Sequence, residues 1–441
     1  MPVSLFNSPV FSGLYSDEEL VRLLDDAADI EQMIRFERSL AKVQGDLGII
    51  PKGSADQIEA ALDTLNIAPE ALASGTTSAG VPVPALVAEL RKRIGEEAGS
   101  WVHWGATSQD VMDTATVLQV KACLAVLELR IAKLIDTLKS QSDQNADQLL
   151  AGRTRSQIST PITLGYRIAQ WAHPLIDAES ELSQLRRNVL KIQFGGASGI
   201  NSAIAPDGSA ISAALARELG LSDSPSWHSN RSSYLALGAW LQQVSAGLAK
   251  MAGDLILLGR SDIAEVSSGS GGGSSTMPQK ANPVQAETIL TLHQIALTAN
   301  SAVATAAHPQ EERDGAKWPL EWAFLPQMII ATGAALRQAQ TLANTITPNP
   351  EQINATFKNN PEIMAETASF VLAKNGISRA QAKDLVAKAA ISDDPFAIVL
   401  AAISPVDIDW SSALDPKTLI GPAKEMSARI FAKRMKPVGS R

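Results

Sequence analysis

An unbroken helix-compatible stretch is the strongest constraint on how this chain folds. From Ala106 to Ala151 there is neither glycine nor proline. Within it, apolar residues alternate spacings of three and four, at Val117, Val120, Leu124, Leu127, Ile131, Leu134 and Leu138. This is a heptad seam, whereas a strand would repeat apolar residues at a period of two. A helix of about 40 residues extends over roughly 60 Å, and helices of that length pack against other long helices, often from other subunits.

The remaining sequence also favours helices over sheets. Aromatic residues make up only 5% of the chain, while alanine and leucine are plentiful. We predict further long helices near residues 162–194, 233–267, 284–307 and 320–345, the first of them bent at Pro174. Glycines recur along the second of these stretches, which indicates close contacts between helices rather than breaks. The sequence therefore predicts an all-α protein.

The chain is long enough for several domains, at 441 residues. Helices are predicted to be shorter in the first hundred residues and after the segment Pro348-Asn-Pro350. We therefore predict an N-terminal helical domain at 1–105, a central long-helix bundle at 106–345 and a small helical domain at 346–441. A glycine-rich mobile loop at 266–278 belongs to the central domain.

Charge and cysteine content argue against several classes of protein. The formal net charge is -8, which disfavours binding to nucleic acid or to an anionic membrane. A single cysteine, Cys123, excludes an internal disulfide and fits a reducing compartment. Neither a long apolar run nor a signal peptide is recognisable, so we expect no membrane span and no secretion signal. No cluster of metal ligands is recognisable either, and we expect no metal.

The segment Gly271-Gly-Gly-Ser-Ser-Thr-Met-Pro-Gln-Lys-Ala-Asn-Pro283 is the first candidate for a functional site. Taken alone, its serine/glycine run is equally typical of a flexible linker. The Met-Pro-Gln-Lys-Ala-Asn-Pro that follows favours function instead. The order predicts a mobile loop that carries a hydroxyl and closes over an anion held by Lys280 and Asn282. Asn282 is also suited to capping the helix that follows Pro283.

A second candidate site is the segment His103-Trp-Gly-Ala-Thr-Ser-Gln-Asp110, which directly precedes the long helix. Thr107 or Ser108 is suited to capping that helix, with Asp110 near its third position. A helix N-terminus also presents free N–H groups and a positive dipole end to an anion. Capping alone and carboxylate binding both fit these residues. His103 is suited either to donating to a carboxylate or to ordinary packing.

Together with Gly152-Arg-Thr-Arg-Ser-Gln-Ile-Ser-Thr-Pro-Ile-Thr163, these two segments resemble the three signatures of the fumarase/aspartase superfamily. That superfamily adds or removes a group β to a carboxylate. The resemblance implies an all-helical, three-domain chain with a central helical bundle. It also implies that Ser274 is the reactive serine, that Thr107 and Ser108 bind a substrate carboxylate, and that Gln157 belongs to the site.

The third signature contains one informative departure. Many lyases of the superfamily have a histidine where this chain has Arg155 or Ile158, and that histidine protonates the departing amine or hydroxide. A carboxylate leaving group needs no such acid, because its conjugate acid has a pKa of about 4. The departure therefore fits a lactonisation, in which a carboxylate adds to a double bond. Arg155 would then hold a further substrate carboxylate, or it forms an ordinary ion pair.

We interpret Thr160-Pro161 as the start of the next helix.

Longer strings narrow the resemblance to one family. Ile192–Gly199, Trp227-His228 with Arg231, and Pro309–Trp322 look like bacterial 3-carboxy-cis,cis-muconate cycloisomerases. The resemblance implies a cofactor-free cytoplasmic enzyme of protocatechuate breakdown that acts on a small polycarboxylate. It further implies a homotetramer around a twenty-helix core, with active sites shared between subunits. Arg231 and Arg313 are candidates for holding substrate carboxylates, although both are also suited to structural ion pairs.

The expected mechanism assigns one role to each segment. One substrate carboxylate attacks the double bond β to another, and Lys280, Asn282, Thr107 and Ser108 stabilise the resulting enediolate. Ser274 delivers a proton to the α carbon.

Two alternatives compete with this hypothesis. One is a fumarate-releasing C–N lyase similar to adenylosuccinate lyase, which the missing histidine disfavours, and the other is a non-enzymatic helical scaffold.

Overall fold

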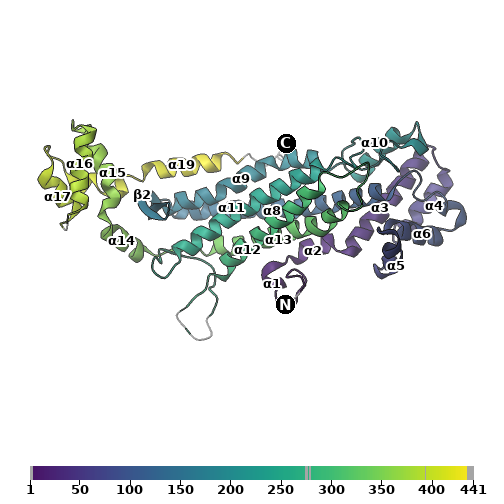
Figure 1. Ribbon diagram of the computed structural model, residues 1–441, viewed down its shortest axis with the longest axis horizontal. Helices are drawn as coiled ribbons and strands as arrows, with labels where there is room; N and C mark the ends of the chain where they lie inside the picture. The colour runs from purple at the N-terminus through teal and green to yellow at the C-terminus, as the bar shows by residue number, and fades with distance from the viewer. Residues whose placement is uncertain (1–2, 274–276, 278–279, 393, 435–441) are drawn as a thin grey trace. The chain divides into compact units, whose positions relative to one another are not determined.

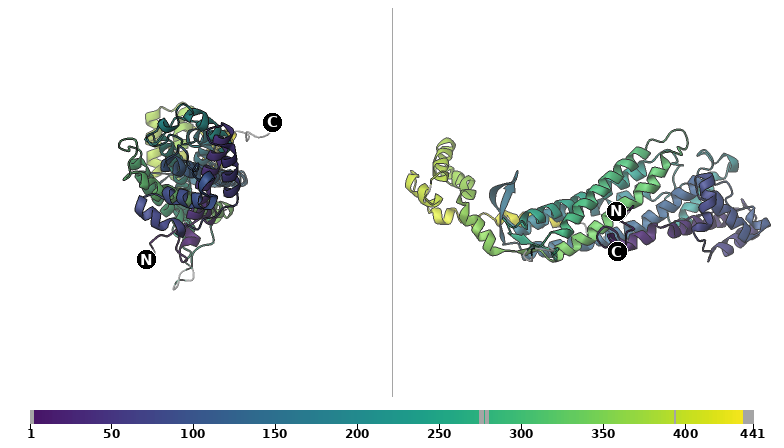
Figure 2. Two further views of the ribbon diagram at one scale, coloured as in Figure 1. Left: turned by 90° about the vertical axis from the view of Figure 1, so that its right-hand side faces the viewer. Right: turned by 60° about the horizontal axis from the view of Figure 1, so that its bottom comes forward.

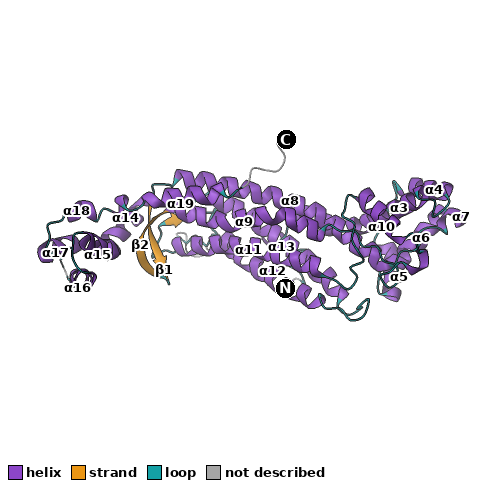
Figure 3. Ribbon diagram, turned by 90° about the horizontal axis from the view of Figure 1, so that it is seen from above, coloured by secondary structure: helices purple, strands orange, loops and turns teal. Residues whose placement is uncertain are grey.

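The computed structural model describes residues 3–273, 277, 280–392 and 394–434. Its backbone divides into two compact units. Unit 1 comprises Met1–Arg130, Glu181–Ser245 and Thr291–Ala335. Unit 2 comprises Ile131–Ser180, Ala246–Leu290 and Leu336–Arg441. Almost all regular structure in the described residues is helical, and only two small two-stranded sheets accompany the helices (Figure 3).

Five long helices dominate the fold, as the sequence predicts. They are α8 (Ser108–Gln144), α9 (Leu164–Val189), α11 (Ser232–Leu258), α12 (Val284–Ala306) and α13 (Trp318–Asn344). Each begins in one unit and ends in the other, and within each unit the helix segments run side by side (Figure 1). None of the helices in the described residues combines the length and apolarity that a membrane crossing requires.

The predicted heptad seam of α8 is buried over its whole length. Every seam residue is at most 1% exposed, from Val117 in unit 1 to Leu138 in unit 2. The glycines of α11 make close contacts at two positions. A Cβ at Gly238 would lie 2.2 Å from Asn300 Oδ1, and a Cβ at Gly247 would lie 3.0 Å from Pro174 Cγ. The same prediction is wrong for Gly253, where a Cβ would meet nothing within 4 Å.

Unit 1 also contains the N-terminal helices. These are α1 (Ser12–Tyr15), α2 (Glu18–Leu24), α3 (Asp26–Asp46), α4 (Lys52–Leu62), α5 (Glu70–Ala79), α6 (Val83–Ile94) and α7 (Glu96–Gly99), with the 3-10 turn η1 (Ser202–Ile204) and α10 (Gly208–Leu219). They enclose an apolar core that includes Phe36, Leu40, Leu86 and Leu90. Val111 and Leu118 of α8 belong to the same core, which fixes the start of α8 against these helices.

Unit 2 contains a β-hairpin where the sequence predicts no strands. Strand β1 (Leu149–Thr154) pairs with β2 (Gln157–Thr163) in antiparallel register. Thr160 and Pro161 therefore lie in a strand, and our interpretation of them as a helix start is wrong because α9 begins only at Leu164. Gly152 permits the pairing, since a Cβ there would lie 2.5 Å from Thr160 O.

The C-terminal part of unit 2 has its own apolar core. The elements of this part are β4 (Thr347–Pro348), α14 (Pro350–Asn359), η2 (Pro361–Met364), α15 (Ala365–Lys374), α16 (Arg379–Ala390), α17 (Phe396–Ile403), α18 (Trp410–Ala413), η3 (Pro416–Thr418) and α19 (Gly421–Ala432). Strand β4 pairs with β3 (Val266–Ser267), which follows α11 in the sequence. Phe396, Leu400 and Trp410 belong to this core. The helices of the C-terminal part are yellow-green in Figure 2. Asn349 caps α14 through Gln352 N, directly after the strand that ends at Pro348. The predicted three-domain division stays a prediction.

Candidate active site

The predicted site residues fall into two groups, one in each unit. Unit 1 contains His103, Thr107, Ser108, Arg231 and Arg313. Unit 2 contains Arg155, Gln157, Lys280 and Asn282. Ser274, the predicted reactive serine, lies outside the described residues. Each group is therefore described within its own unit.

The start of α8 forms only one half of the predicted capping box: Asp110 makes its contact, but no hydroxyl cap from Thr107 or Ser108 is formed with a described residue. The helix begins at Ser108, and Asp110 Oδ2 accepts a hydrogen bond from Thr107 N at 3.0 Å. This is the reciprocal contact of a capping box. Among the described residues, neither the Thr107 nor the Ser108 hydroxyl has a hydrogen-bond partner, and both side chains are only partly buried. Both hydroxyls are therefore available to an anion at the helix N-terminus.

Asp110 ties the start of α8 to the segment that follows α9. Its carboxylate is fully buried and accepts from Gly195 N and Gly196 N, both at 2.9 Å. Gln193 Nε2 donates to the same carboxylate at 3.2 Å. These contacts join the first turn of α8 to residues 193–196. The sequence predicts only the capping role of Asp110, although this aspartate ends the segment His103–Asp110 that resembles a superfamily signature.

His228 is the last partner of Asp110, with Nε2 2.9 Å from Oδ1. Because an ionised carboxylate only accepts, His228 Nε2 must carry a proton. The buried Nδ1 of His228 has no hydrogen-bond partner among the described residues. The backbone oxygen of His228 accepts from Gln109 Nε2 at 3.1 Å. The sequence leaves open whether His103 or His228 replaces the missing general acid, because a lone histidine beside a tryptophan gives no sign of its partner.

Arg313 extends this network towards the surface. Its Nε donates to Gln109 Oε1 at 2.9 Å, and its Nη2 donates to Ala197 O at 3.2 Å. The side chain is only partly buried, and Nη1 makes no hydrogen bond to a described residue. The predicted anion-binding role of Arg313 is compatible with this geometry, because part of the guanidinium has no partner among the described residues.

Arg231 has a different environment from the one we predicted. Its guanidinium is 3% exposed and lies between Asp113 and Glu321, with Nη1 2.7 Å from Asp113 Oδ2 and Nε 2.8 Å from Glu321 Oε1. With the Trp227 carbonyl, these acceptors engage every N–H of the group. Burial opposes the charge, but the two carboxylates raise the pKa of Arg231 well above its usual value. No donor is left for a substrate, so this geometry supports a structural brace.

The backbone of His103 adopts a left-handed conformation, with φ of 65°. This conformation is uncommon outside glycine and is frequent at functional sites. Nδ1 of His103 lies 2.6 Å from Oε1 of the fully buried Glu37. Burial lowers the pKa of His103, but Glu37 outweighs it and raises that pKa above its ordinary value. Glu37 therefore stabilises the imidazolium form of His103 relative to that of an unpaired histidine, four residues before Thr107.

In unit 2, Arg155 lies on the turn of the β1–β2 hairpin, Gln157 is the first residue of β2, and both are exposed. Arg155 and Ser156 both have positive φ, of 50° and 65°. Arg155 has no ion pair with any described residue, whereas the nearby Arg153 makes a bidentate pair with buried Glu265 at 2.7 and 2.9 Å. The ordinary ion pair that we considered for Arg155 is therefore not formed with any described residue.

Lys280 and Asn282 lie on the returning arm of the glycine-rich loop. Gly272 N donates to Asn282 O at 2.7 Å, and Asn282 N donates to Gly272 O at 2.9 Å. This antiparallel bridge holds the two arms of the loop together at its base. Lys280 is exposed, and its backbone N–H donates to Met277 O at 3.0 Å. In the parts of the chain that the structure describes, no group of three or more metal-ligating side chains is arranged to hold an ion.

A family model described as lyase matches residues 7–297. The chain therefore belongs to this lyase family, and its fold is the all-α fold of the fumarase/aspartase superfamily. It is 33% identical to the 3-carboxy-cis,cis-muconate cycloisomerase of Pseudomonas aeruginosa, over 96% of both chains. The crystal structure of the 3-carboxy-cis,cis-muconate lactonizing enzyme from Pseudomonas putida matches with a TM-score of 0.88 and 30% identity, over 97% of this chain and 99% of that one. Adenylosuccinate lyase of Pyrococcus abyssi is 30% identical, over 86% of this chain and 85% of its own.

Proposed function

We propose that this protein is a 3-carboxy-cis,cis-muconate cycloisomerase. The observation that carries the proposal is Arg155, which is exposed, has no ion pair with a described residue, and occupies the place of the superfamily's proton-donating histidine. A guanidinium binds a carboxylate in a forked pair but does not donate its proton at neutral pH. The substitution therefore suits a substrate with an additional carboxylate and a reaction without a basic leaving group.

The described side chains suit a reaction that builds negative charge on a carboxylate. An oxygen of one substrate carboxylate forms the new C–O bond, and the π electrons of the double bond move onto the second carboxylate as an enediolate. The N-terminus of α8, with the Thr107 and Ser108 hydroxyls, would stabilise this charge, as would Lys280 and Asn282. Ser274 would then give a proton to the α carbon and regain one from solvent, so that the reaction takes up one proton in total.

We further propose that the enzyme is a cytoplasmic homotetramer of protocatechuate catabolism, with active sites shared between subunits and no cofactor. Two observations support sharing. The exposed hairpin turn offers Arg155 without a partner among the described residues of its own unit, and the long helices carry exposed apolar residues. Leu129 of α8 is 72% exposed and Leu257 of α11 is 52% exposed, as expected for helices that pack against another copy. Neither nucleic acid nor a membrane is a proposed partner.

The direct test is the ultraviolet absorbance of 3-carboxy-cis,cis-muconate mixed with purified protein. Lactone closure removes the conjugation of the diene, so the absorbance should fall quickly. Lys280→Ala should slow this fall by roughly 10²–10³-fold if Lys280 stabilises the enediolate. Unchanged absorbance at high enzyme concentration would refute the cycloisomerase.

One alternative function has support of its own. The similarity to adenylosuccinate lyase favours a fumarate-releasing C–N lyase. Fumarate release from adenylosuccinate would identify that activity, and we expect none because no histidine stands at position 155 or 158.

A further inference from the structure

The turn that carries Arg155 lies at the outer end of the short β1–β2 hairpin. Arg153 of β1 is the partner of Ile158 of β2, two residues before Arg155. This end of the hairpin buries little surface, since Thr154, Gln157 and Ile158 are all exposed. An isolated two-stranded sheet is at best marginally stable in water. Contacts from outside the sheet are therefore needed to fix the turn.

Close packing does not supply those contacts. An open cavity of about 340 Å³ lies beside the hairpin, and Arg153 and Ile158 line it from the hairpin side. Ala355 and Thr356 of α14 line the same cavity. The hairpin and α14 therefore do not pack closely against each other across this space.

The carboxylate of Glu265 connects the two sides of the cavity. Its side chain is fully buried, and Arg153 donates to it in a forked pair, with Nη1 2.7 Å from Oε2 and Nη2 2.9 Å from Oε1. Thr356 Oγ1 of α14 donates to Oε1 at 2.7 Å. A forked arginine–carboxylate pair fixes direction as well as distance. Glu265 thus holds β1 to α14, and it does so two residues before Arg155.

The backbone around Glu265 is also fixed. Glu265 N donates to Leu258 O at 3.0 Å, at the end of α11, and Glu265 O accepts from Asn349 N at 2.8 Å, directly before α14. The preceding residue, Ala264, has a φ of 48°. An alanine rarely adopts this left-handed conformation, which persists where the surrounding structure enforces it and is frequent at functional sites. Glu265 is therefore a fixed point to which the hairpin is attached.

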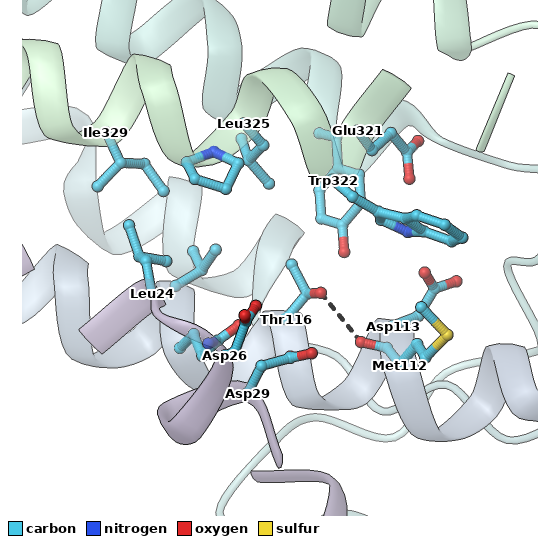
Figure 4. A pocket seen from close by; sticks show the side chains of 14 residues that line it. Leu24, Asp26, Asp29, Met112, Asp113, Thr116, Glu321, Trp322, Leu325 and Ile329 are labelled. Carbon is cyan, nitrogen blue, oxygen red and sulfur yellow. Dashed lines mark hydrogen bonds between the residues drawn. The ribbon is translucent and has the colours of Figure 1, made fainter. Parts of the chain in front are cut away.

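A buried ion pair is a costly way to gain stability alone, because apolar residues of similar size often stabilise a protein as well. The forked geometry adds a fixed direction. Unit 1 has a comparable brace beside a cavity of about 160 Å³, where Asp113 and Glu321 line the wall (Figure 4) and both pair with Arg231. In unit 2, the brace lies next to a turn that carries a candidate substrate ligand.

We propose that Glu265 is a positioning residue, which acts through Arg153 to hold the hairpin turn where Arg155 meets a substrate carboxylate. This inference rests on the proposed function, because that function assigns Arg155 to substrate binding. Glu265 itself is sealed from a substrate, since its side chain is fully buried. Loss of the brace should therefore act on KM, and only by way of Arg155.

A double-mutant cycle on KM tests this role. The steady-state lactonisation of 3-carboxy-cis,cis-muconate is measured for the wild type, Glu265→Gln, Arg155→Ala and the double variant. Glu265→Gln keeps the shape of the side chain and removes its charge, and KM should rise by roughly 10–100-fold because the turn is misplaced. In the Arg155→Ala background, the same change should leave KM within about twofold, because no guanidinium remains to be positioned. An equal rise in both backgrounds, or an unchanged KM for Glu265→Gln alone, would overturn the proposal.

Glu179→Gln is the matched control. Glu179 of α9 also accepts a forked pair in unit 2, from Arg434 at 2.9 and 3.1 Å, and neither residue belongs to the candidate site. This variant should leave KM unchanged, and a rise as large as that of Glu265→Gln would contradict a specific role for Glu265. Circular dichroism verifies that the variants fold. If Glu265→Gln does not fold, Arg153→Lys takes its place in the cycle with the same expectation, because lysine keeps the charge and loses the fork.

Hydrogen exchange distinguishes failure of this inference from failure of the proposed function. If the wild type does not lactonise the muconate, the proposed function fails, and the brace is judged by exchange alone. The amides of residues 153–158 should exchange at least about tenfold faster in Glu265→Gln than in the wild type, because local opening of the hairpin is then easier. In Glu179→Gln they should exchange at the wild-type rate. Unchanged exchange in Glu265→Gln would overturn the brace whether or not the enzyme is active.

Discussion

Arg231 and Arg155 lie in opposite surroundings, one sealed inside unit 1 and the other exposed in unit 2. Arg231 donates every N–H to protein acceptors. Its Cζ lies 4.7 Å from the centroid of the Trp227 ring and 4.9 Å from that of the Tyr234 ring. Arg155 lies on a two-residue turn and has no ion-pair partner among the described residues. The difference indicates two roles. Arg231, whose N–H groups all have partners, holds helices together, whereas Arg155, which has no ion-pair partner among the described residues, is available to a ligand.

The same contrast applies to the rest of the candidate site. In unit 1, Asp110 and His228 form a buried network that fixes the start of α8, so the hydroxyls of Thr107 and Ser108 have a rigid support. In unit 2, Lys280 and Arg155 are carried by a loop and a turn. We infer that the N-terminus of α8 in unit 1 is preorganised for an anion, whereas the two cations of unit 2 lie outside helices and strands. Four variants test this distinction.

The largest expected effect is on the loop of unit 2. Ser274→Ala should lower kcat by roughly 10²–10⁴-fold if Ser274 is the proton donor, because general acid catalysis contributes about that much. The measurement is the rate of absorbance loss of 3-carboxy-cis,cis-muconate at saturating substrate. Ser275→Ala is the matched control and should retain most activity. A near-normal kcat for Ser274→Ala would remove that serine from the mechanism.

Replacing the sealed arginine should mainly affect stability. Arg231→Met leaves Asp113 and Glu321 buried without a cation, which costs about 3–5 kcal/mol when one partner of a buried pair is removed. Chemical denaturation followed by circular dichroism measures the loss. A stable Arg231→Met protein with a raised KM would reverse our assignment and return Arg231 to substrate binding.

Replacing the exposed arginine should do the opposite. Arg155→Ala removes one charge-assisted contact to the substrate, worth about 1.5–3 kcal/mol, so KM should rise by roughly 10–150-fold. The free energy of unfolding should change by less than about 0.5 kcal/mol, as for other surface positions. Arg379→Ala, an exposed arginine on α16, should alter neither quantity. An unchanged KM for Arg155→Ala would contradict the proposed role of this residue.

The sequence was sufficient for the parts of the fold that depend on local periodicity. The seam of α8 and the extents of the other long helices follow from spacings within one segment, so they could be predicted. The β1–β2 hairpin could not, because its strands lack clear alternation and its turn residues Arg155 and Ser156 are not glycine or asparagine. Contacts between residues far apart in the sequence could not be predicted either. The partners of Arg231 are 118 and 90 positions away, and nothing in the local sequence identifies them.

The smallest expected effect is that of Asp29→Asn on the free energy of unfolding. Unlike Arg231, Asp29 of unit 1 has no ion pair with a described residue. Its folded pKa of about 6 lies above the ordinary value of 3.8. The unfolded chain therefore releases this proton at lower pH than the folded chain does, and folding loses stability as the pH rises from about 4 to 6. Asp29→Asn should relieve this loss, with a gain on the order of 1 kcal/mol at pH 7.5 after allowance for partial exposure. At pH 4 the gain should vanish, because the wild-type carboxyl is then neutral in the folded state. Thermal unfolding of the wild type and of Asp29→Asn at both pH values measures the gain in stability. Equal gains at pH 4 and pH 7.5 would mean that the carboxylate charge is not the cause.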